Sequence, residues 1–84
     1  MLLKEDDLKK ILADGADAHK KGDFVAAEKC FRQFLSEVPD HMNGLNYLGR
    51  ALADQGKLDE AVANFNNAIA KYPDYPESYN NLGR

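Results

Sequence analysis

The sequence has a single cysteine, Cys30, no tryptophan, and only three prolines in 84 residues. One cysteine cannot form an internal disulfide, which fits a reducing compartment. No apolar run approaches the roughly 20 residues that cross a membrane, and the opening MLLKEDD breaks the apolar stretch that a secretory signal requires. We therefore expect a cytoplasmic protein without a membrane partner.

An excess of basic residues is also missing. Fourteen Asp and Glu oppose eleven Lys and Arg, for a net charge of −3, and the cations are scattered along the chain. Because phosphate backbones are bound by clustered cations, nucleic acid is not the expected partner. A composition of 44% hydrophobic and 30% charged residues is typical of a folded chain, and its length allows one small module over residues 1–84.

Motifs for catalysis or for metal binding are absent as well. His19, Cys30 and His41 match no zinc-ligand spacing, and no nucleophile and base lie in a recognisable motif. The glycines follow a regular period and do not form a phosphate-binding loop. We expect no enzymatic activity, no cofactor and no metal site.

What the sequence does contain is an internal repeat. When it is shifted by 34 residues, segment 8–41 aligns with segment 42–75, and six positions are identical. These are glycines, an alanine, a phenylalanine, a proline and an aspartate, mostly residue types that backbone geometry or packing requires. The identical pairs are Gly15/Gly49, Gly22/Gly56, Ala27/Ala61, Phe31/Phe65, Pro39/Pro73 and Asp40/Asp74.

Each unit is predicted to form two helices, because apolar residues recur at helical spacing in both halves. The first helices carry Leu8, Ile11, Leu12 and Gly15, and Leu45, Leu48, Gly49 and Leu52. The second helices carry Phe24, Ala27, Phe31, Phe34, Leu35 and Val38, and Leu58, Ala61, Phe65, Ala68, Ile69 and Tyr72. A proline follows each second helix and ends it.

Glycines are expected to serve two purposes. Gly22 and Gly56 lie between the two helices of a unit, where a left-handed cap conformation costs glycine nothing. Gly15 and Gly49 lie inside helices, at a cost of up to about 1 kcal/mol relative to alanine. We expect a close approach of the paired helix to offset this cost, with Ala27 and Ala61 facing these two glycines.

These residues carry a family resemblance. The series Leu45, Leu48, Gly49, Leu52, Ala61, Phe65 and Pro73 is similar to the signature of the tetratricopeptide repeat, a 34-residue helix–turn–helix unit. The first unit matches it through Gly15, Ala18, Gly22, Phe24, Ala27, Phe31 and Pro39. Two residues depart from the pattern, Asp14 at a leucine position and Phe34 at a small-residue position, and they predict looser or rearranged packing of the first unit.

The resemblance implies an all-α helical repeat, an α–α superhelix with repeat one at 8–41, repeat two at 42–75 and the opening of a third at 76–84. It further implies that the first helices line a concave groove that binds a peptide segment of a partner protein. The candidate groove residues are Lys9, Leu12, His19, Lys20, Asn43, Asn46, Arg50, Asp54, Glu77, Asn80 and Arg84.

Two of these side chains recur at the repeat distance, Asn46 with Asn80 and Arg50 with Arg84. An amide can pair with a peptide backbone and a guanidinium with a carboxylate, so this row is a hypothetical ligand contact. The alternative is that duplication alone keeps these residues and that water solvates them. The lysine, asparagine and arginine set with which related repeats clamp a C-terminal carboxylate is absent, since Leu12, Ala16, Tyr47, Glu77 and Asn81 stand at its places.

The last residues resemble a repeat that begins without finishing. We expect residues 76–84 to cover the apolar stripe of the second unit, with Tyr79 and Leu82, and the chain to be a piece of a longer array. An open C-terminal end would allow pairing with another copy, so self-assembly is one alternative function. The segment YPDYPESYNNLGR is also similar to repeats beside O-linked glycosyltransferase domains, so a targeting module of a longer enzyme is another.

Overall fold

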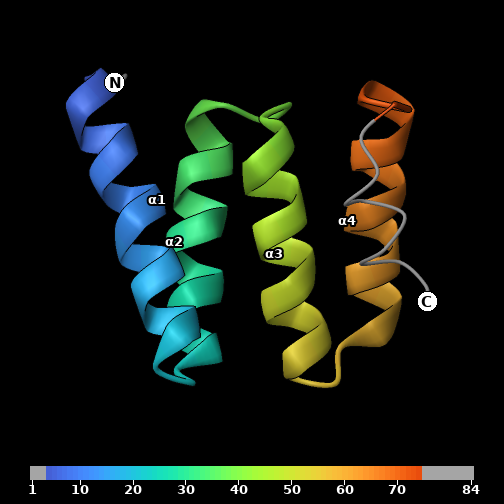
Figure 1. Cartoon of the computed structure of the whole chain (residues 1–84), viewed down its shortest axis with the longest axis horizontal. Coiled ribbons are helices and arrows are strands. Elements are labelled where there is room, and N and C mark those ends of the chain that lie inside the picture. The colour runs from blue at the N-terminus through green and yellow to red at the C-terminus, as the bar shows by residue number, and fades with distance from the viewer. Residues whose placement is uncertain (1–3, 75–84) are drawn as a thin grey trace.

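The computed structural model describes residues 4–74, which form four helices joined by short turns. Successive helices run antiparallel and lie in a row from α1 to α4 (Figure 1). The expected all-α helical repeat is thereby confirmed, while the third unit at 76–84, with Tyr79 and Leu82, lies outside the described residues. The helices are α1 (Glu5–Lys20), α2 (Phe24–Glu37), α3 (Met42–Asp54) and α4 (Leu58–Lys71).

Local signals explain where the helices begin and end. Gly22 and Gly56 have φ of 85° and 82°, the left-handed conformation predicted for the turns inside each unit. The Asp23 carboxylate accepts a hydrogen bond from the Ala26 N–H and caps α2. The second helix of each unit ends two residues before its proline, as predicted, because proline has no N–H to donate.

Each helix pair closes on a contact between a glycine and a phenylalanine ring. A Cβ at Gly15 would lie 2.5 Å from Cε1 of Phe31, and one at Gly49 would lie 2.8 Å from Cδ1 of Phe65. No side chain fits into that space, so the close approach predicted for the helical glycines is confirmed. The expected partners were wrong, however. The phenylalanine rings lie against the glycines, whereas Ala27 and Ala61, which were expected there, are buried one helical turn before the rings.

The core centres on α3, which packs between α2 on one side and α4 on the other (Figure 1). Its residues Leu48, Ala51 and Leu52 join Phe31 and Phe65 in one buried cluster. By contrast, Gly15 is the only buried residue of α1, whose leucines are half-buried. Among the described helices, α1 packs against α2 and touches α3 only at one edge, so less of its surface is covered than that of α3.

Two residues of the predicted apolar stripe of α4 lie outside the core. Leu58 is 62% exposed. Its counterpart in the first repeat, Phe24, instead packs against His19, with 5.2 Å between the ring centres. The counterpart of His19 at the repeat distance is Ala53, which is too small to cover Leu58. Tyr72 is also exposed and donates its hydroxyl hydrogen to the carbonyl oxygen of Asp40 at 2.5 Å.

Phe34 stands where the repeat pattern has a small residue, and rearranged packing accommodates its ring. The ring is 4% exposed, and a Cβ at Gly44 would lie 3.1 Å from its Cδ2. The His41 ring packs edge-on against the Phe34 ring, with 4.8 Å between the ring centres. A large residue on α2 is thus matched by the absence of a side chain on α3, which keeps the volume of the core filled.

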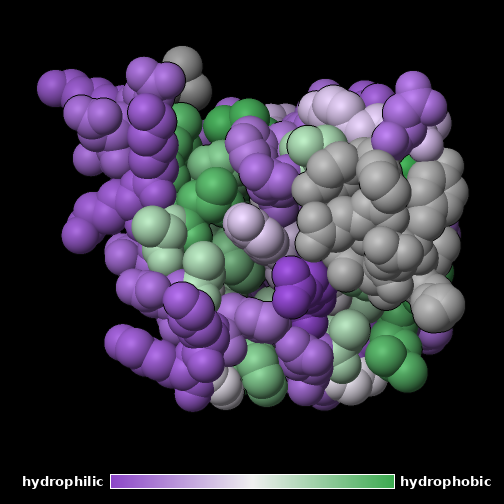
Figure 2. Space-filling view, viewed as in Figure 1, coloured by the Kyte–Doolittle hydropathy of each residue, from purple (hydrophilic) through white to green (hydrophobic). Residues whose placement is uncertain are grey.

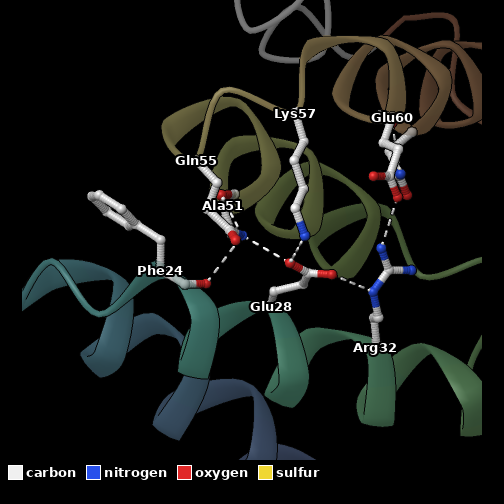
Figure 3. Close-up of polar contacts among 8 residues, drawn as sticks. Phe24, Glu28, Arg32, Ala51, Gln55, Lys57 and Glu60 are labelled. Carbon is white, nitrogen blue, oxygen red and sulfur yellow. Dashed lines mark hydrogen bonds and ion pairs between the residues drawn. The ribbon is translucent and has the colours of Figure 1, made fainter.

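A network around Glu28 joins the two repeats on α2, α4 and the turn between α3 and α4 (Figure 3). The carboxylate of Glu28 accepts hydrogen bonds from Arg32 at 2.7 Å, Gln55 at 2.8 Å and Lys57 at 3.1 Å. Arg32 also reaches Glu60 of α4 at 3.1 Å. The hydrogen bond from Arg32, followed by that from Gln55, lowers the pKa of Glu28 to about 2, which outweighs the opposing effect of burial.

This pKa predicts an acid-sensitive contribution to stability. The folded pKa lies below the ordinary value of 4.5, so the contribution is present above about pH 4.5 and is lost as the pH falls toward 2. Because Arg32 and Lys57 are half in water, we expect Glu28→Gln to lower the free energy of unfolding at pH 7 by about 1–3 kcal/mol. Urea denaturation should show this difference shrinking between pH 4.5 and 2.

The exposed carboxylate of Asp17 provides the matched control, and Asp17→Asn should change the unfolding free energy at pH 7 by less than about 0.5 kcal/mol. An effect of Glu28→Gln that stayed constant across this pH range would contradict the role assigned to its charge.

Candidate peptide-binding groove

A groove runs between α1 and α3, with side chains of α2 at its floor. α1 and α3 point in the same direction, so residues 34 apart lie side by side along it. Three adjoining hollows along α1 make up what we call the α1–α3 groove: the first lies between α1, α2 and the turn before α3, and the other two lie between α1 and α3. The Phe34 hollow, of about 220 Å³, is lined by Glu5, Leu8, Lys9, Leu12, Phe34, Val38 and His41.

The other two hollows continue along α1 toward its C-terminal end. The Ala13 hollow, of about 230 Å³, is lined by Lys9, Leu12, Ala13, Ala16 and Tyr47. The Arg50 hollow, of about 180 Å³, is lined by Ala16, His19, Phe31, Tyr47 and Arg50. Neighbouring hollows share Lys9 with Leu12, or Ala16 with Tyr47, so they form one continuous surface.

The chemistry of the groove changes along its length. Aliphatic and aromatic side chains dominate the Phe34 and Ala13 hollows, whereas the Arg50 hollow combines an imidazole and a guanidinium with the Phe31 ring. Figure 2 shows this face, with apolar surface between α1 and α3 and hydrophilic surface along the outer side of α1. Such a groove offers burial of apolar side chains at one end and hydrogen bonding at the other.

A hydrogen bond between the two first helices closes the Arg50 end. Nε2 of His19 lies 2.6 Å from Oδ2 of Asp54, and the two side chains are 23% and 46% exposed. The His19 ring also packs against Phe24. Two residues predicted for the groove from different repeats thus touch each other, and their contact holds the last turn of α1 near the last turn of α3.

Apart from Asn46, the remaining predicted residues fall into four groups. Lys9, Leu12 and Arg50 line the hollows, and Lys20 is exposed at the end of α1. Asn43 lines a separate hollow at the α2–α3 turn. The positions of Glu77, Asn80 and Arg84 lie outside the described residues.

Asn46 does not match one of the two alternatives that its recurrence suggested, that of a side chain solvated by water. It is 3% exposed, its Nδ2 donates to the Met42 carbonyl at 3.1 Å, and its Oδ1 is buried without a hydrogen-bond partner. It is therefore not a solvated surface residue, because the packing around α3 removes its amide from water. The hydrogen bond within its own helix satisfies only half of that amide.

Tyr47 and His41 also belong to this surface, although the candidate groove residues chosen from the sequence include neither of them. The Tyr47 ring packs 5.4 Å from that of Phe31 and separates two of the hollows. His41 caps α3, with its Nδ1 accepting from the Gly44 N–H at 3.1 Å, and burial lowers its pKa, which favours the neutral ring that can accept. The position before a helix was a usable signal for His41, but the role of Tyr47 depends on tertiary packing.

Other kinds of site were sought across the described residues. Over positions 4–74 there is no cluster of three or more His, Cys, Asp or Glu side chains placed to hold a metal ion. Within the same range, no helix is both long enough and apolar enough to cross a membrane.

The contact between His19 and Asp54 predicts an energetic coupling of the two repeats across the groove. We expect a double-mutant cycle of His19→Ala and Asp54→Ala, measured by urea denaturation at pH 7, to give a coupling of about 0.5–1 kcal/mol. The exposed pair Lys10 and Asp17 on the same helix supplies the control cycle. Additive effects of the two substitutions would show that the contact does not join α1 to α3 in solution.

Comparison with known families agrees with this geometry. The model of the TPR repeat matches residues 49–84, from the glycine that faces Phe65 through the last residue. Among curated proteins, none matches the sequence. The family match and the two helix pairs repeated at 34 residues together identify the fold as an all-α helical repeat of the tetratricopeptide type.

Proposed function

We propose that the chain is a protein–protein interaction module that binds a peptide segment of a partner in the α1–α3 groove. TPR repeats generally mediate protein interactions, and the observation that supports this site is the continuous row of three hollows along α1. The proposal includes no catalysis by the chain itself and places the interaction in the cytoplasm.

The shape and chemistry of the groove support a peptide over a flat protein surface. Its hollows of about 180–230 Å³ are each the size of one or two side chains, and they lie in a line. A peptide can insert side chains into such hollows and leave its backbone along the rim. Lys9 and Arg50 add charged groups on opposite sides of the groove, one from each repeat.

Self-assembly is a second candidate, favoured by the surface of α4. Leu58 and Val62 are one helical turn apart and are 62% and 41% exposed. Apolar side chains at this spacing form a strip that another helix could cover. Solution molar mass measured against concentration separates this candidate from peptide binding by a monomer.

Binding of peptides selected from a random library on the immobilised chain tests the proposed site. We expect Lys9→Ala and Arg50→Ala each to weaken the dissociation constant of a selected peptide by about 5- to 30-fold, since each removes a charged hydrogen-bond donor from the groove. Fluorescence anisotropy would measure these constants.

Lys10→Ala is the control, because Lys10 is an exposed neighbour of Lys9 on α1 that lines none of the three hollows. Selected peptides that bind all three variants as tightly as the unaltered chain would place the interaction elsewhere on the molecule.

A further inference from the structure

A histidine lies at the joint between the two repeats and at one end of the groove. His41 is the N-cap of α3, and its half-buried ring lines the Phe34 hollow. The same ring lines a second hollow, of about 390 Å³, at the α2–α3 turn. Its edge packs against the buried Phe34 ring, which belongs to the floor of the groove. The state of this one ring therefore affects both the start of α3 and the Phe34 end of the groove.

The cap depends on the neutral form of the His41 ring. Its Nδ1 accepts a hydrogen bond from the Gly44 N–H at 3.1 Å, so the single proton of the ring lies on Nε2. A second proton would have to bind Nδ1, and the new N–H would then face the Gly44 N–H, donor against donor. Protonation therefore removes the acceptor that satisfies a free N–H in the first turn of α3.

The surroundings of the ring also oppose a positive charge. The N-terminal end of a helix carries a partial positive charge, which repels a cation, and α3 has no acidic residue in its first turn to offset this. Packing against Phe34 takes part of the ring out of water. Burial accordingly lowers the pKa of His41 below its ordinary value of 6.5.

Charged groups of both signs surround His41. Carboxylates favour the protonated ring and ammonium groups oppose it. Asp40 and Lys71 form an ion pair of 3.5 Å, and both are more than half exposed. Because water and salt screen such exposed charges, burial and the helix end decide the charge of the ring. The ionisable groups near the ring are Glu5 and Lys9 from α1, Glu37 from the end of α2, Asp40 from the turn, and Lys71 and Tyr72 from the end of α4.

We propose that His41 is a pH switch: its protonation releases the first turn of α3 and opens the Phe34 end of the groove, so that the groove binds its peptide less tightly as the pH falls. This inference rests on the proposed function and adds a means of regulating that site. In the neutral state, the ring caps α3 and forms a wall of the Phe34 hollow. In the charged state, the ring turns toward water, where both of its N–H groups find acceptors, and Phe34 loses its edge contact.

Nuclear magnetic resonance of the ¹⁵N-labelled chain tests the switch itself. At pH 7.5 we expect the ring nitrogens of His41 to show a proton on Nε2 and none on Nδ1. As the pH is lowered to 5, the amide signal of Gly44 should shift along the same titration curve as the His41 ring. A His41 ring that is still neutral at pH 5, or a Gly44 amide that does not follow it, would overturn the inference.

Urea denaturation measures what the neutral cap contributes to folding. Because the folded pKa of His41 lies below 6.5, this contribution is present above about pH 6.5 and is lost as the pH falls through the folded pKa. His41→Asn is the matched variant, since asparagine is a good N-cap that gains no proton in this range. Between pH 7.5 and 5, we expect the urea midpoint of the unaltered chain to fall by about 0.5–1 M more than that of His41→Asn. Equal falls of the two midpoints would contradict the switch.

Two further variants make this comparison specific to His41. His19 is the other of the two histidines in the sequence, so His19→Gln should keep the acid response of the unaltered chain. A response that disappears in His19→Gln would assign it to the contact with Asp54 and overturn the inference. His41→Ser supplies a second cap without a titrating ring, and it serves as the matched variant if His41→Asn does not fold.

Fluorescence anisotropy over the same pH range connects the switch to binding. The probe is a library-selected peptide without histidine, so that the peptide itself adds no imidazole to the titration. We expect its dissociation constant to weaken by about 5-fold or more as His41 becomes protonated, and by less than about 2-fold in His41→Asn.

The outcomes separate this inference from the proposed function. If Lys9→Ala weakens the peptide but protonation of His41 does not, the inference fails and the groove remains the binding site. If neither Lys9→Ala nor protonation of His41 weakens the peptide, the proposed function fails and the inference fails with it.

Discussion

The contact between a helical glycine and a phenylalanine ring sets the distance between the two helices of each repeat. Gly15 receives the ring of Phe31, and Gly49 receives that of Phe65. Any side chain at either glycine would have to displace a buried ring, so the helices can approach this closely only without one. The glycine lowers helix propensity, and the burial of an aromatic ring against its backbone offsets that cost. Because both repeats use the same contact, their first helices come to lie parallel at equivalent places.

The groove follows from this arrangement. α3 is buried between α2 and α4, which fixes Tyr47 and Arg50 on its remaining face. The rings of Phe31 and Phe34 extend from α2 into the space between the first helices and form the floor of the hollows. At the same time, the network around Glu28 joins the repeats through α2, α4 and the turn between α3 and α4. The groove is thus a consequence of repeat stacking, and its chemistry depends on the few residues that stacking leaves uncovered.

Most of the fold could be predicted from the sequence because its signals are local or periodic. The turns at Gly22 and Gly56, the stops before the prolines and the period of 34 residues all act within a few residues of where they stand or through repetition. Predictions that needed the identity of a distant neighbour were less successful. Leu58 follows the helical pattern of a core residue, yet it is exposed, and the small Ala53 stands at the position equivalent to His19, whose ring packs against Phe24 in the first repeat.

The candidate site could be predicted from the sequence only in part, for the same reason. The sequence placed Lys9, Leu12, His19 and Arg50 on one face, and the structure brings them to the hollows. The bond from His19 to Asp54 joins residues 35 apart in the sequence, and the bonds of Glu28 to Gln55 and Lys57 join residues 27 and 29 apart. No local pattern encodes such pairs. The burial of Asn46 could likewise not be predicted from the sequence, since asparagine side chains are mostly exposed to water.

The central claim is that the face between α1 and α3 is where a partner binds. Chemical-shift mapping of the ¹⁵N-labelled chain, titrated with a library-selected peptide, tests this claim most directly. The account predicts that the largest backbone shifts fall on Leu12, Ala16, Tyr47 and Arg50 and that the outer surface of α4, at Leu58 and Val62, stays unchanged. Shifts concentrated on α4, with the α1–α3 groove unaffected, would contradict it.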